Sequence, residues 1–333
     1  MKDIARDLGV SVVTVSKVLR NHSDIGNETR ERVLQRIKEL NYRPNLTAQS
    51  LVTGRTYLVG LIVPDLVHPF FTEVAQFLSR ALRKEGYYLI LSSSEEDPEL
   101  EEREIDQLLG RNLDALIIAS SSATPAIFSR IEEQQTPFLL IDRQFPGFSA
   151  NYIGVDDQAM GVLATNHLIQ IGCQRIAHLR GPENTPGLQR LAGYQHALLD
   201  SGREPNPEYV VAPGNVDVHS WQQGFTATKT LLGLNPRPDG IFCYNDPLAI
   251  GAIDCILEAG LRVPEDIAVI GCGNLHYDAS LRVSLSSVNQ HSQEIGEQAA
   301  ELILQAMRSK TPLPHRQIIL DAEVVPRRST QRS

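Results

Sequence analysis

The chain has 333 residues, of which 42% are hydrophobic and 21% are charged. This length is too great for one ordinary core, and the composition is that of a globular protein rather than a disordered one. No apolar run reaches the roughly 20 residues that span a bilayer, and the start lacks the apolar stretch of a signal peptide. We therefore expect a cytoplasmic protein with no membrane contact.

The four cysteines, at positions 173, 243, 255 and 272, include no C-x-x-C pair. The sequence therefore suggests neither a zinc site nor a disulfide framework, and we expect buried free thiols.

Charge is distributed unevenly along the chain. Residues 1–57 hold ten Lys or Arg against six Asp or Glu, a net charge of +4, which leaves 21 against 34, or −13, for the remainder. A basic module on an acidic body indicates that the module alone has an anionic partner.

The first 45 residues predict three short helices. Gly9 is expected to end the first helix, and the Ser11 hydroxyl is expected to cap the second. Apolar residues at helical spacing mark the first and third helices: Ile4, Ala5, Leu8, Val33, Ile37 and Leu40. Two helices joined by a tight turn, with a third as support, form the helix-turn-helix arrangement.

The second helix has two apolar faces. Val15, Val18 and Leu19 share one arc, which suits a core. The opposite arc is formed by Val12, Val13, Ser16, Lys17 and Arg20. That arc places two valines beside two cations in water, which is either incidental, since single exposed apolar residues are common, or the mark of a binding surface.

The pattern changes after a mostly polar stretch, residues 46–56, which reads as a linker. From Tyr57, apolar runs alternate with helical stretches, which is typical of parallel sheets covered on both faces. The runs are YLVGLIV, YYLIL, ALIIA, FLLID, YIGVD, RIAHL, GIFCYN and IAVIG. Eight such units predict two α/β lobes, with ligands at the carboxyl ends of the strands.

Seven segments together resemble the LacI/GalR family of bacterial transcription regulators over essentially the whole chain. They are KDIARDLGVSVVTVSKVL, TRERVLQRIKELNYRPN, GLIVPDLVHPFF, HLIQIGCQRIAHLRGP, RLAGYQHAL, NDPLAIGAI and GLRVPEDIAVIG. The resemblance implies a small all-α helix-turn-helix domain followed by an α/β, two-lobed, periplasmic-binding-protein-like domain with parallel sheets.

The resemblance also implies domain boundaries. The helix-turn-helix domain is expected at 1–45, a hinge helix or linker at 46–56 and an effector-binding and dimerisation domain at 57–328. Within the last, the N-lobe is expected at about 57–156 plus 288–316 and the C-lobe at about 157–287 plus 317–328.

The resemblance gives the second helix a DNA-reading role. The major groove admits a helix, thymine offers a methyl group to apolar side chains, and Lys or Arg can bind guanine or phosphate. Val12 and Val13, with Lys17, are therefore expected to read bases, and Thr14 and Ser16 to contact phosphates. Arg20 departs from the Asn usual in the family.

The linker is implied to form a hinge helix on operator DNA, with Ala48 in the contact and Leu51 wedged into a minor-groove base step. Otherwise Leu51 is an ordinary linker leucine. Isolated short helices are marginal, so two copies held in a homodimer are expected, and operator half-sites mirror that symmetry. No leucine heptads follow Val325, and the sequence does not decide whether a tetramer forms.

Effector-binding candidates lie after the predicted strands. They are Asp65, His68, Phe70, Phe71, Asp142, Arg143, Arg190, His219, Trp221, Asn245, Asp246, Gly273, Asn274 and Gln290. Carboxylate and guanidinium groups suit hydroxyl-bearing ligands, and the resemblance implies a small molecule such as a carbohydrate.

Several of these candidates have a second interpretation. Phe70 and Phe71 pack on a ligand or in the lobe core, and His68 is a ligand contact or a surface histidine. Asp142, Arg190 and Asp246 bind the effector or form local ion pairs. Either His219 or Trp221 takes the stacking position, or Trp221 packs on the surface.

One position departs from many sugar-responsive members of the family. Gly273 stands where those proteins have Asp, with Asn274 next. The change removes an acceptor for sugar hydroxyls, so the sequence does not name the ligand.

The function predicted from the sequence is a DNA-binding regulator, a repressor, whose operator affinity a bound effector shifts between two lobe arrangements. A transport solute-binding protein is the alternative, although it has no use for a basic helix-turn-helix. An enzyme is not expected, because nucleotide-binding glycine motifs, the G-x-S-x-G elbow and metal-ligand clusters are missing, and no cofactor or metal is expected.

Overall fold

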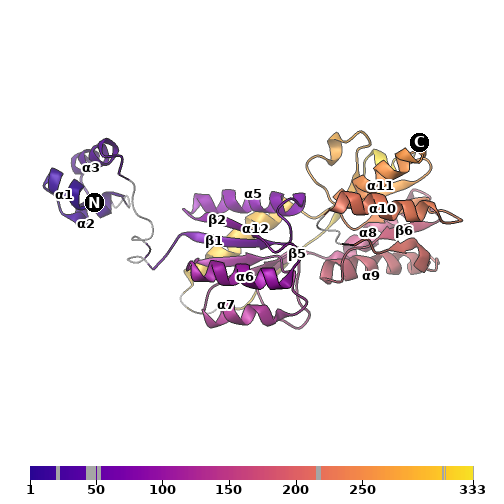
Figure 1. Cartoon of the computed structure of the whole chain (residues 1–333), viewed down its shortest axis with the longest axis horizontal. Helices are drawn as coiled ribbons and strands as arrows, with labels where there is room; N and C mark the ends of the chain where they lie inside the picture. The colour runs from indigo at the N-terminus through magenta and orange to yellow at the C-terminus, as the bar shows by residue number, and fades with distance from the viewer. Residues whose placement is uncertain are drawn as a thin grey trace. The chain divides into compact units, whose positions relative to one another are not determined.

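The computed structural model describes residues 1–19, 23–42, 50, 54–214, 219–309, 311 and 313–332. It divides into two compact units, Met1–Thr56 and Tyr57–Ser333 (Figure 1). Arg20, Ala48 and Leu51, together with most of the expected hinge, lie outside the described residues.

The first unit contains the three expected helices, α1 (Lys2–Leu8), α2 (Val12–Leu19) and α3 (Asn27–Glu39). Gly9 ends α1 in the left-handed conformation at φ 65°, which glycine adopts without strain. The Ser11 hydroxyl accepts a hydrogen bond from the backbone N–H of Thr14 at 2.9 Å, as expected for a cap.

A small apolar core holds these helices together. It consists of Ile4, Ala5, Val15, Val18 and Val33, with Leu19 and Ile37 partly buried against it. Leu40 was expected on this face, but it is 43% exposed. It is instead the residue that ends α3, where the chain leaves the helical spacing.

The N-lobe of the second unit is built on a six-stranded parallel sheet of order β11-β5-β4-β3-β1-β2. Its strands are β1 (Leu58–Val63), β2 (Tyr88–Ser93), β3 (Ala115–Ile118), β4 (Phe138–Ile141), β5 (Tyr152–Val155) and β11 (Gln317–Leu320). Helices cover both faces: α5 (Pro69–Lys84) and α12 (Ser292–Arg308) on one, α6 (Pro98–Gly110), η1 (Pro125–Phe128) and α7 (Ser129–Glu133) on the other.

The C-lobe repeats this layered plan with a sheet of order β12-β10-β9-β8-β6-β7, in which only β12 is antiparallel. Its strands are β6 (Ile176–Leu179), β7 (Val210–Val211), β8 (Gly240–Cys243), β9 (Ala268–Gly273), β10 (Ser286–Asn289) and β12 (Glu323–Val325). Its helices are α8 (Asp157–Gln170) and α9 (Thr185–Asp200) on one face, and α10 (Ser220–Leu232) and α11 (Asp246–Glu258) on the other. Short 3₁₀ turns complete it: η2 (Pro207–Tyr209), η3 (Asp278–Ser280) and η4 (Arg328–Thr330).

All eight predicted apolar runs form strands, and the two-lobed α/β prediction is confirmed. The expected lobe boundaries near the C-terminus were wrong in two places. Residues 288 and 289 belong to β10 of the C-lobe, because they pair with β9 and β12. Residues 317–320 belong to the N-lobe, because β11 pairs in parallel with β5.

The chain crosses between the lobes three times, after β5, after β10 and after β11. All four cysteines are buried and free, as expected. Within the described part of the chain, none of the helices combines the length and apolar character that a membrane crossing requires.

Candidate functional site

The exposed face of α2 is the first candidate site. Val12 and Val13 are 40% and 64% exposed, whereas Val15 and Val18 are buried in the core of the unit. The two-faced pattern predicted from the sequence is therefore present in the structure. Two neighbouring valines in water are unfavourable unless a partner covers them.

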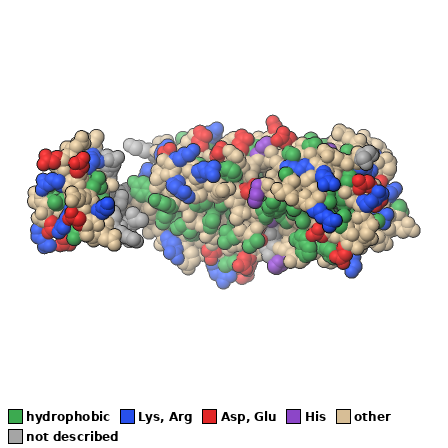
Figure 2. Space-filling model, turned by 90° about the horizontal axis from the view of Figure 1, so that it is seen from above, with side chains coloured by type: hydrophobic (Ala, Val, Ile, Leu, Met, Phe, Trp, Pro, Cys, Tyr) green, Lys and Arg blue, Asp and Glu red, His purple; other side chains and the backbone are tan. Residues whose placement is uncertain are grey.

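Polar side chains surround these valines. Lys17 forms an ion pair with Asp24, and Thr14 and Ser16 are half-buried on the same helix. Both cationic and anionic side chains reach the surface of this unit (Figure 2). Because the Lys17 and Asp24 side chains are 39% and 53% exposed, water screens their pairing, which adds little stability and leaves the ammonium group available to another anion.

The second candidate site lies where the strand ends of the two lobes meet. His68 precedes α5 of the N-lobe, and Asn245 precedes α11 of the C-lobe. Their side chains are in contact, with Asn245 Nδ2 3.2 Å from His68 Nε2. The Asn245 Oδ1 accepts from the Leu248 N–H at 2.9 Å, which orients the amide toward the histidine.

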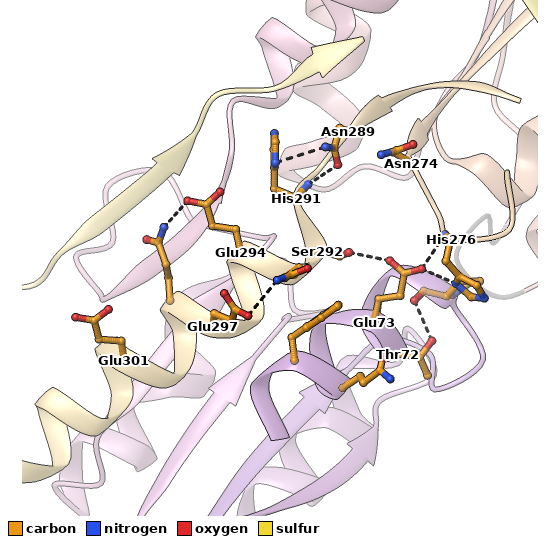
Figure 3. Close-up of a pocket in the computed structure, with 15 residues that line it drawn as sticks. Thr72, Glu73, Asn274, His276, Asn289, His291, Ser292, Glu294, Glu297 and Glu301 are labelled. Atoms are coloured by element: carbon orange, nitrogen blue, oxygen red, sulfur yellow. Dashed lines mark hydrogen bonds and ion pairs between the residues drawn. The ribbon is translucent and has the colours of Figure 1, made fainter. Parts of the chain in front are cut away.

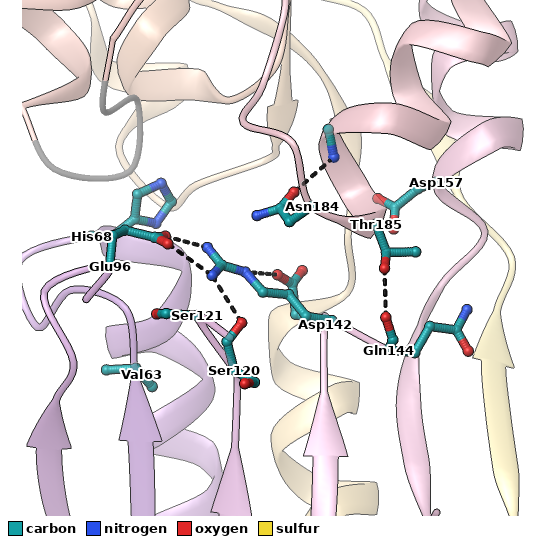
Figure 4. Close-up of polar contacts among 12 residues, drawn as sticks. Val63, His68, Glu96, Ser120, Ser121, Asp142, Gln144, Asp157, Asn184 and Thr185 are labelled. Carbon is teal, nitrogen blue, oxygen red and sulfur yellow. Dashed lines mark hydrogen bonds and ion pairs between the residues drawn. The ribbon is translucent and has the colours of Figure 1, made fainter. Parts of the chain in front are cut away.

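Asp142 and Arg143 follow β4 and are both buried. Gln290, which follows β10 of the C-lobe, donates to the Asp142 carboxylate at 3.3 Å. Arg143 donates to the Ser120 carbonyl at 3.0 Å and is paired with Glu96 (Figure 4). Asp142 itself has φ 61°, a strained backbone conformation for a non-glycine residue and one found often at binding sites.

Arg190 forms local pairs rather than reaching across the gap. Its guanidinium donates to Asp157 and to the Tyr244 carbonyl, at 2.8 and 2.7 Å, and lies over the Tyr244 ring. All of these partners belong to the C-lobe. The local ion-pair interpretation therefore describes Arg190 in this structure.

Burial governs the charges of the interlobe groups. Burial, together with the positive charges of Arg143 and Arg190, lowers the pKa of His68 to about 4, so this histidine is neutral at pH 7. Burial raises the pKa of Asp142, while Arg190 and Arg143 oppose that rise.

A pocket of about 430 Å³ opens beside His68. Asp65, His219 and Trp221 line it, so these candidates share one cavity with His68. The Trp221 indole donates to Asp254 at 2.8 Å, and its side chain is 44% exposed. Asp65 accepts from the Val67 N–H at 2.9 Å, which shapes the loop after β1.

Three candidates are buried within a single lobe. Phe70 and Phe71 lie in the N-lobe core with their ring centroids 5.1 Å apart, as the lobe-core interpretation has it, and the Phe71 ring also lies 5.4 Å from that of His68. Asp246 is also fully buried, accepting from the Ser287 hydroxyl at 2.6 Å and the Leu275 N–H at 3.3 Å.

The Gly273 position lies against Asp246. A Cβ at Gly273 would approach within 2.7 Å of the Asp246 carboxylate, so this backbone leaves little room for a side chain. Asn274 is held by Arg327, whose guanidinium donates to its side-chain oxygen at 2.6 Å. Asn274 thus lies at the edge of a different groove.

That groove, of about 1130 Å³, contains another link between the lobes (Figure 3). Glu73 on α5 accepts from the backbone N–H of His276 at 3.0 Å and lies 2.7 Å from its ring Nδ1. Ser292 also donates to Glu73 at 2.7 Å. Histidine side chains are visible where the two lobes adjoin (Figure 2).

Sequence reasoning missed several residues of the interlobe site. Ser120 and Ser121 directly follow a predicted strand, and Asp157 lies just beyond another, so the strand-end rule could have found them. Asn184 caps α9 and faces the gap, a position that N-T-P at a helix start could have signalled. Nothing in the local sequence points to Glu96.

Two family models match the chain, one over the helical unit and one over the two-lobed unit. Residues 1–45 match the family described as bacterial regulatory proteins, lacI family. Residues 56–323 match the family of periplasmic binding proteins and sugar binding domain of the LacI family.

Individual relatives cover nearly the full chain. The HTH-type transcriptional repressor PurR of Haemophilus influenzae (strain PittEE) is 31% identical over 93% of this chain and 91% of its own length. The ribose operon repressor of Halalkalibacterium halodurans is 30% identical over 99% and 97%.

Two solved structures are similar over 98% of both chains. One is the lac repressor dimer bound to operator and the anti-inducer ONPF, with 26% identity and a TM-score of 0.86. The other is the transcriptional regulator CelR in complex with cellobiose, with 28% identity and a TM-score of 0.75.

A helix-turn-helix unit attached to a two-lobed α/β unit defines a transcription regulator with a separate ligand-binding part. The chain belongs to the LacI family of bacterial regulatory proteins. A transport protein without a regulatory role, the alternative raised by the lobes alone, is not favoured, because the DNA-binding family matches the first 45 residues.

Proposed function

We propose that this chain is a repressor that binds a palindromic operator as a homodimer and that a small molecule held between its lobes changes its operator affinity. The observation that carries the proposal is the exposure of Val12 and Val13 on the helix whose opposite face holds Val15 and Val18 in the core. Residues of this kind on a major-groove helix can contact thymine methyl groups.

Lys17 belongs to the same proposed DNA-binding surface of α2. Its ammonium group is paired with Asp24 and can exchange that partner for a guanine or a phosphate oxygen. Thr14 and Ser16 lie on the same helix and can position it through phosphate contacts. In this proposal the valines, with Lys17, supply sequence preference, and Thr14 and Ser16 supply orientation.

The dimer follows from the symmetry of operators. One helix of eight residues contacts only a few base pairs, so a second copy is needed for a specific site. The lac repressor is a dimer on its operator in the similar structure, which agrees with this assembly.

The effector is proposed to bind among His68, Asp142, Arg143, Asn245 and Gln290. These residues come from both lobes and already contact one another in pairs, so a ligand among them would alter the relative stability of two lobe arrangements. A 5- to 150-fold change in operator affinity needs a difference of about 1–3 kcal/mol between the arrangements. A few hydrogen bonds supply that difference.

Selection of preferred sites from random duplex DNA tests the DNA-binding part. The wild type is expected to select a palindrome, and Val13→Ala is expected to change base preference at one symmetric pair of positions. Leu34→Ala removes an exposed apolar side chain from α3 and serves as the matched control, with an unchanged selected site. An unchanged site for Val13→Ala would contradict the base-reading role.

The salt dependence of binding tests Lys17. If its contact is to phosphate, Lys17→Ala is expected to weaken binding to all duplexes alike and to reduce the slope of log affinity against log salt by about 1. Repeating the operator measurement with a panel of metabolites then tests the effector part. A full-length dimer that shows no preference for any duplex over scrambled competitor would refute the proposed function.

A further inference from the structure

Arg143 has a partner that the resemblance to known regulators does not account for. Its guanidinium is paired with the carboxylate of Glu96, through Nη1 at 3.1 Å and through Nη2. The Arg143 side chain is 3% exposed and that of Glu96 is 15% exposed. The two-point contact is the geometry in which a guanidinium binds any carboxylate.

Glu96 stands on a loop rather than on a regular element. It lies between β2 and α6, and both Glu95 and Glu96 have positive φ, 52° and 58°. Two successive non-glycine residues in this region make the loop conformation costly. The contact with Arg143 offsets that cost, so the loop can relax once Glu96 leaves the guanidinium.

The other buried ion pair at the site, between Asp157 and Arg190, is held in place by the fold. Asp157 lies in the first turn of α8, and the Asp157 and Arg190 side chains are 3% and 2% exposed. Because Asp157 belongs to a helix packed in the C-lobe, it cannot turn away without disturbing that helix. Asp142 also lies beside Arg143, with 3.9 Å between the Arg143 Nε and an Asp142 carboxylate oxygen. Glu96 makes the two-point contact and stands on a loop, so it is the carboxylate that can be exchanged.

The C-lobe presents an N–H donor on the other side of the site. The Asn184 Oδ1 accepts from the Gly187 N–H at 3.0 Å, which orients the amide, while its Nδ2 is buried and has no partner among the described residues. Figure 4 shows this nitrogen pointing toward the side on which Glu96 and Asp142 lie. Gly273 contributes no side chain, so the C-lobe adds no carboxylate at that position.

We propose that Glu96 holds the place on Arg143 that the carboxylate of the effector takes, and that the effector is a polyhydroxylated carboxylic acid such as a sugar acid. This rests on the proposed function and names its ligand class. The acid group replaces Glu96 charge for charge, while the hydroxyl groups meet Asn184, Asn245 and Gln290. A neutral ligand that separates Glu96 from Arg143 would take the two-point carboxylate contact away from a buried cation without replacing its charge, which is unfavourable.

Rescue of Glu96→Gln by formate tests whether the position accepts an external carboxylate. Full-length protein is unfolded thermally in sodium formate or in sodium chloride of equal ionic strength, with the fluorescence of Trp221 as the signal. We expect the variant to melt below the wild type and its Tm to rise with the logarithm of formate concentration. Glu95→Gln, an exposed neighbour on the same loop, is the matched control and is expected to show no formate effect.

The double variant Glu96→Gln/Arg143→Gln removes both charges and should lose the response to formate. A formate response that persists in the double variant, or that is missing from Glu96→Gln, would overturn the proposal.

Calorimetric titration of the wild type provides a second test that does not depend on the stability of the variants. D-gluconate is compared with D-glucose, and D-galacturonate with D-galactose. D-glucose 6-phosphate is the third anionic probe. We expect an acid to bind in preference to its neutral partner, and Glu96→Gln to bind it roughly tenfold more tightly because the internal competitor is gone. Tighter binding of a neutral sugar, or of the phosphate, would overturn the assignment.

Failure of this inference is distinguishable from failure of the proposed function. Glu96→Gln is expected to retain selective operator binding, since Glu96 lies outside the helical unit. If the wild type binds no operator selectively, the proposed function fails whatever formate does. If operator binding is selective but formate has no effect, only the ligand class is wrong.

Discussion

Replacing His68 by glutamine is expected to flatten the pH dependence of unfolding of the two-lobed unit. His68 is buried against Asn245, and its pKa of about 4 lies well below the ordinary 6.5. The unfolded chain therefore binds a proton near pH 6.5 that the folded chain refuses until about pH 4. Stability from this group is present above pH 6.5 and is lost as the pH falls toward 4.

The size of the effect follows from the same two pKa values. Their difference corresponds to about 3 kcal/mol in total, at 1.36 kcal/mol for each pKa unit. Between pH 7 and pH 4.5, the wild type should lose roughly 2 kcal/mol through His68. His178, whose pKa burial lowers to about 3, changes stability in the same direction in both proteins and cancels in the comparison.

Urea unfolding at the two pH values measures the difference. Trp221 is the only tryptophan in the chain and lies in the C-lobe, so its fluorescence reports the two-lobed unit without contribution from the helical unit. Glutamine keeps a polar partner for Asn245 but does not titrate. His196→Gln on exposed α9 surface is the control. Equal losses for the wild type and His68→Gln would refute the argument.

Three further substitutions, with Val13→Ala as a control, test what stabilises each unit. Val15→Ala should destabilise the helical unit by about 2 kcal/mol, because Val15 is fully buried, whereas Val13→Ala should leave stability unchanged; hydrogen exchange in α2 measures both. Ser11→Ala should cost about 1 kcal/mol in the same assay through loss of the cap, and normal exchange would argue against that role. Gly193→Ala should destabilise the two-lobed unit by about 1–3 kcal/mol in urea unfolding, since its Cβ would lie 2.1 Å from the Gln158 carbonyl oxygen; a gain would mean that α8 and α9 can separate.

Much of the fold could be predicted because buried parallel strands are continuous apolar runs. The four strands that the sequence did not predict lack this signal. β10 reads SSVN, and β7 has two residues. β11 and β12 lie at sheet edges, and the exposure of β11 alternates along the strand. Their pairing depends on long-range register, which local composition does not contain.

The strand-end rule located Asp142, Arg143 and Asn245, and these residues do lie at the junction of the lobes. The residues with which these side chains pair could not be predicted in the same way. Whether Arg190 meets a ligand or Asp157 depends on the packing of α9 against α8, and the pairing of Glu96 with Arg143 depends on a loop of unusual backbone conformation. Phe70 and Phe71 had two interpretations because aromatic residues suit both a core and a ligand wall.

The chain crosses between the lobes three times, and these crossings affect when each lobe can fold during synthesis. The N-lobe sheet receives its edge strand β11 from residues 317–320, after nearly all of the C-lobe has been made. A nascent chain that has released only residues 57–156 lacks both this strand and the covering helix α12. Each lobe therefore lacks an edge strand until residues 317–325 have been made, so removal of β11 and β12 should disable both lobes together.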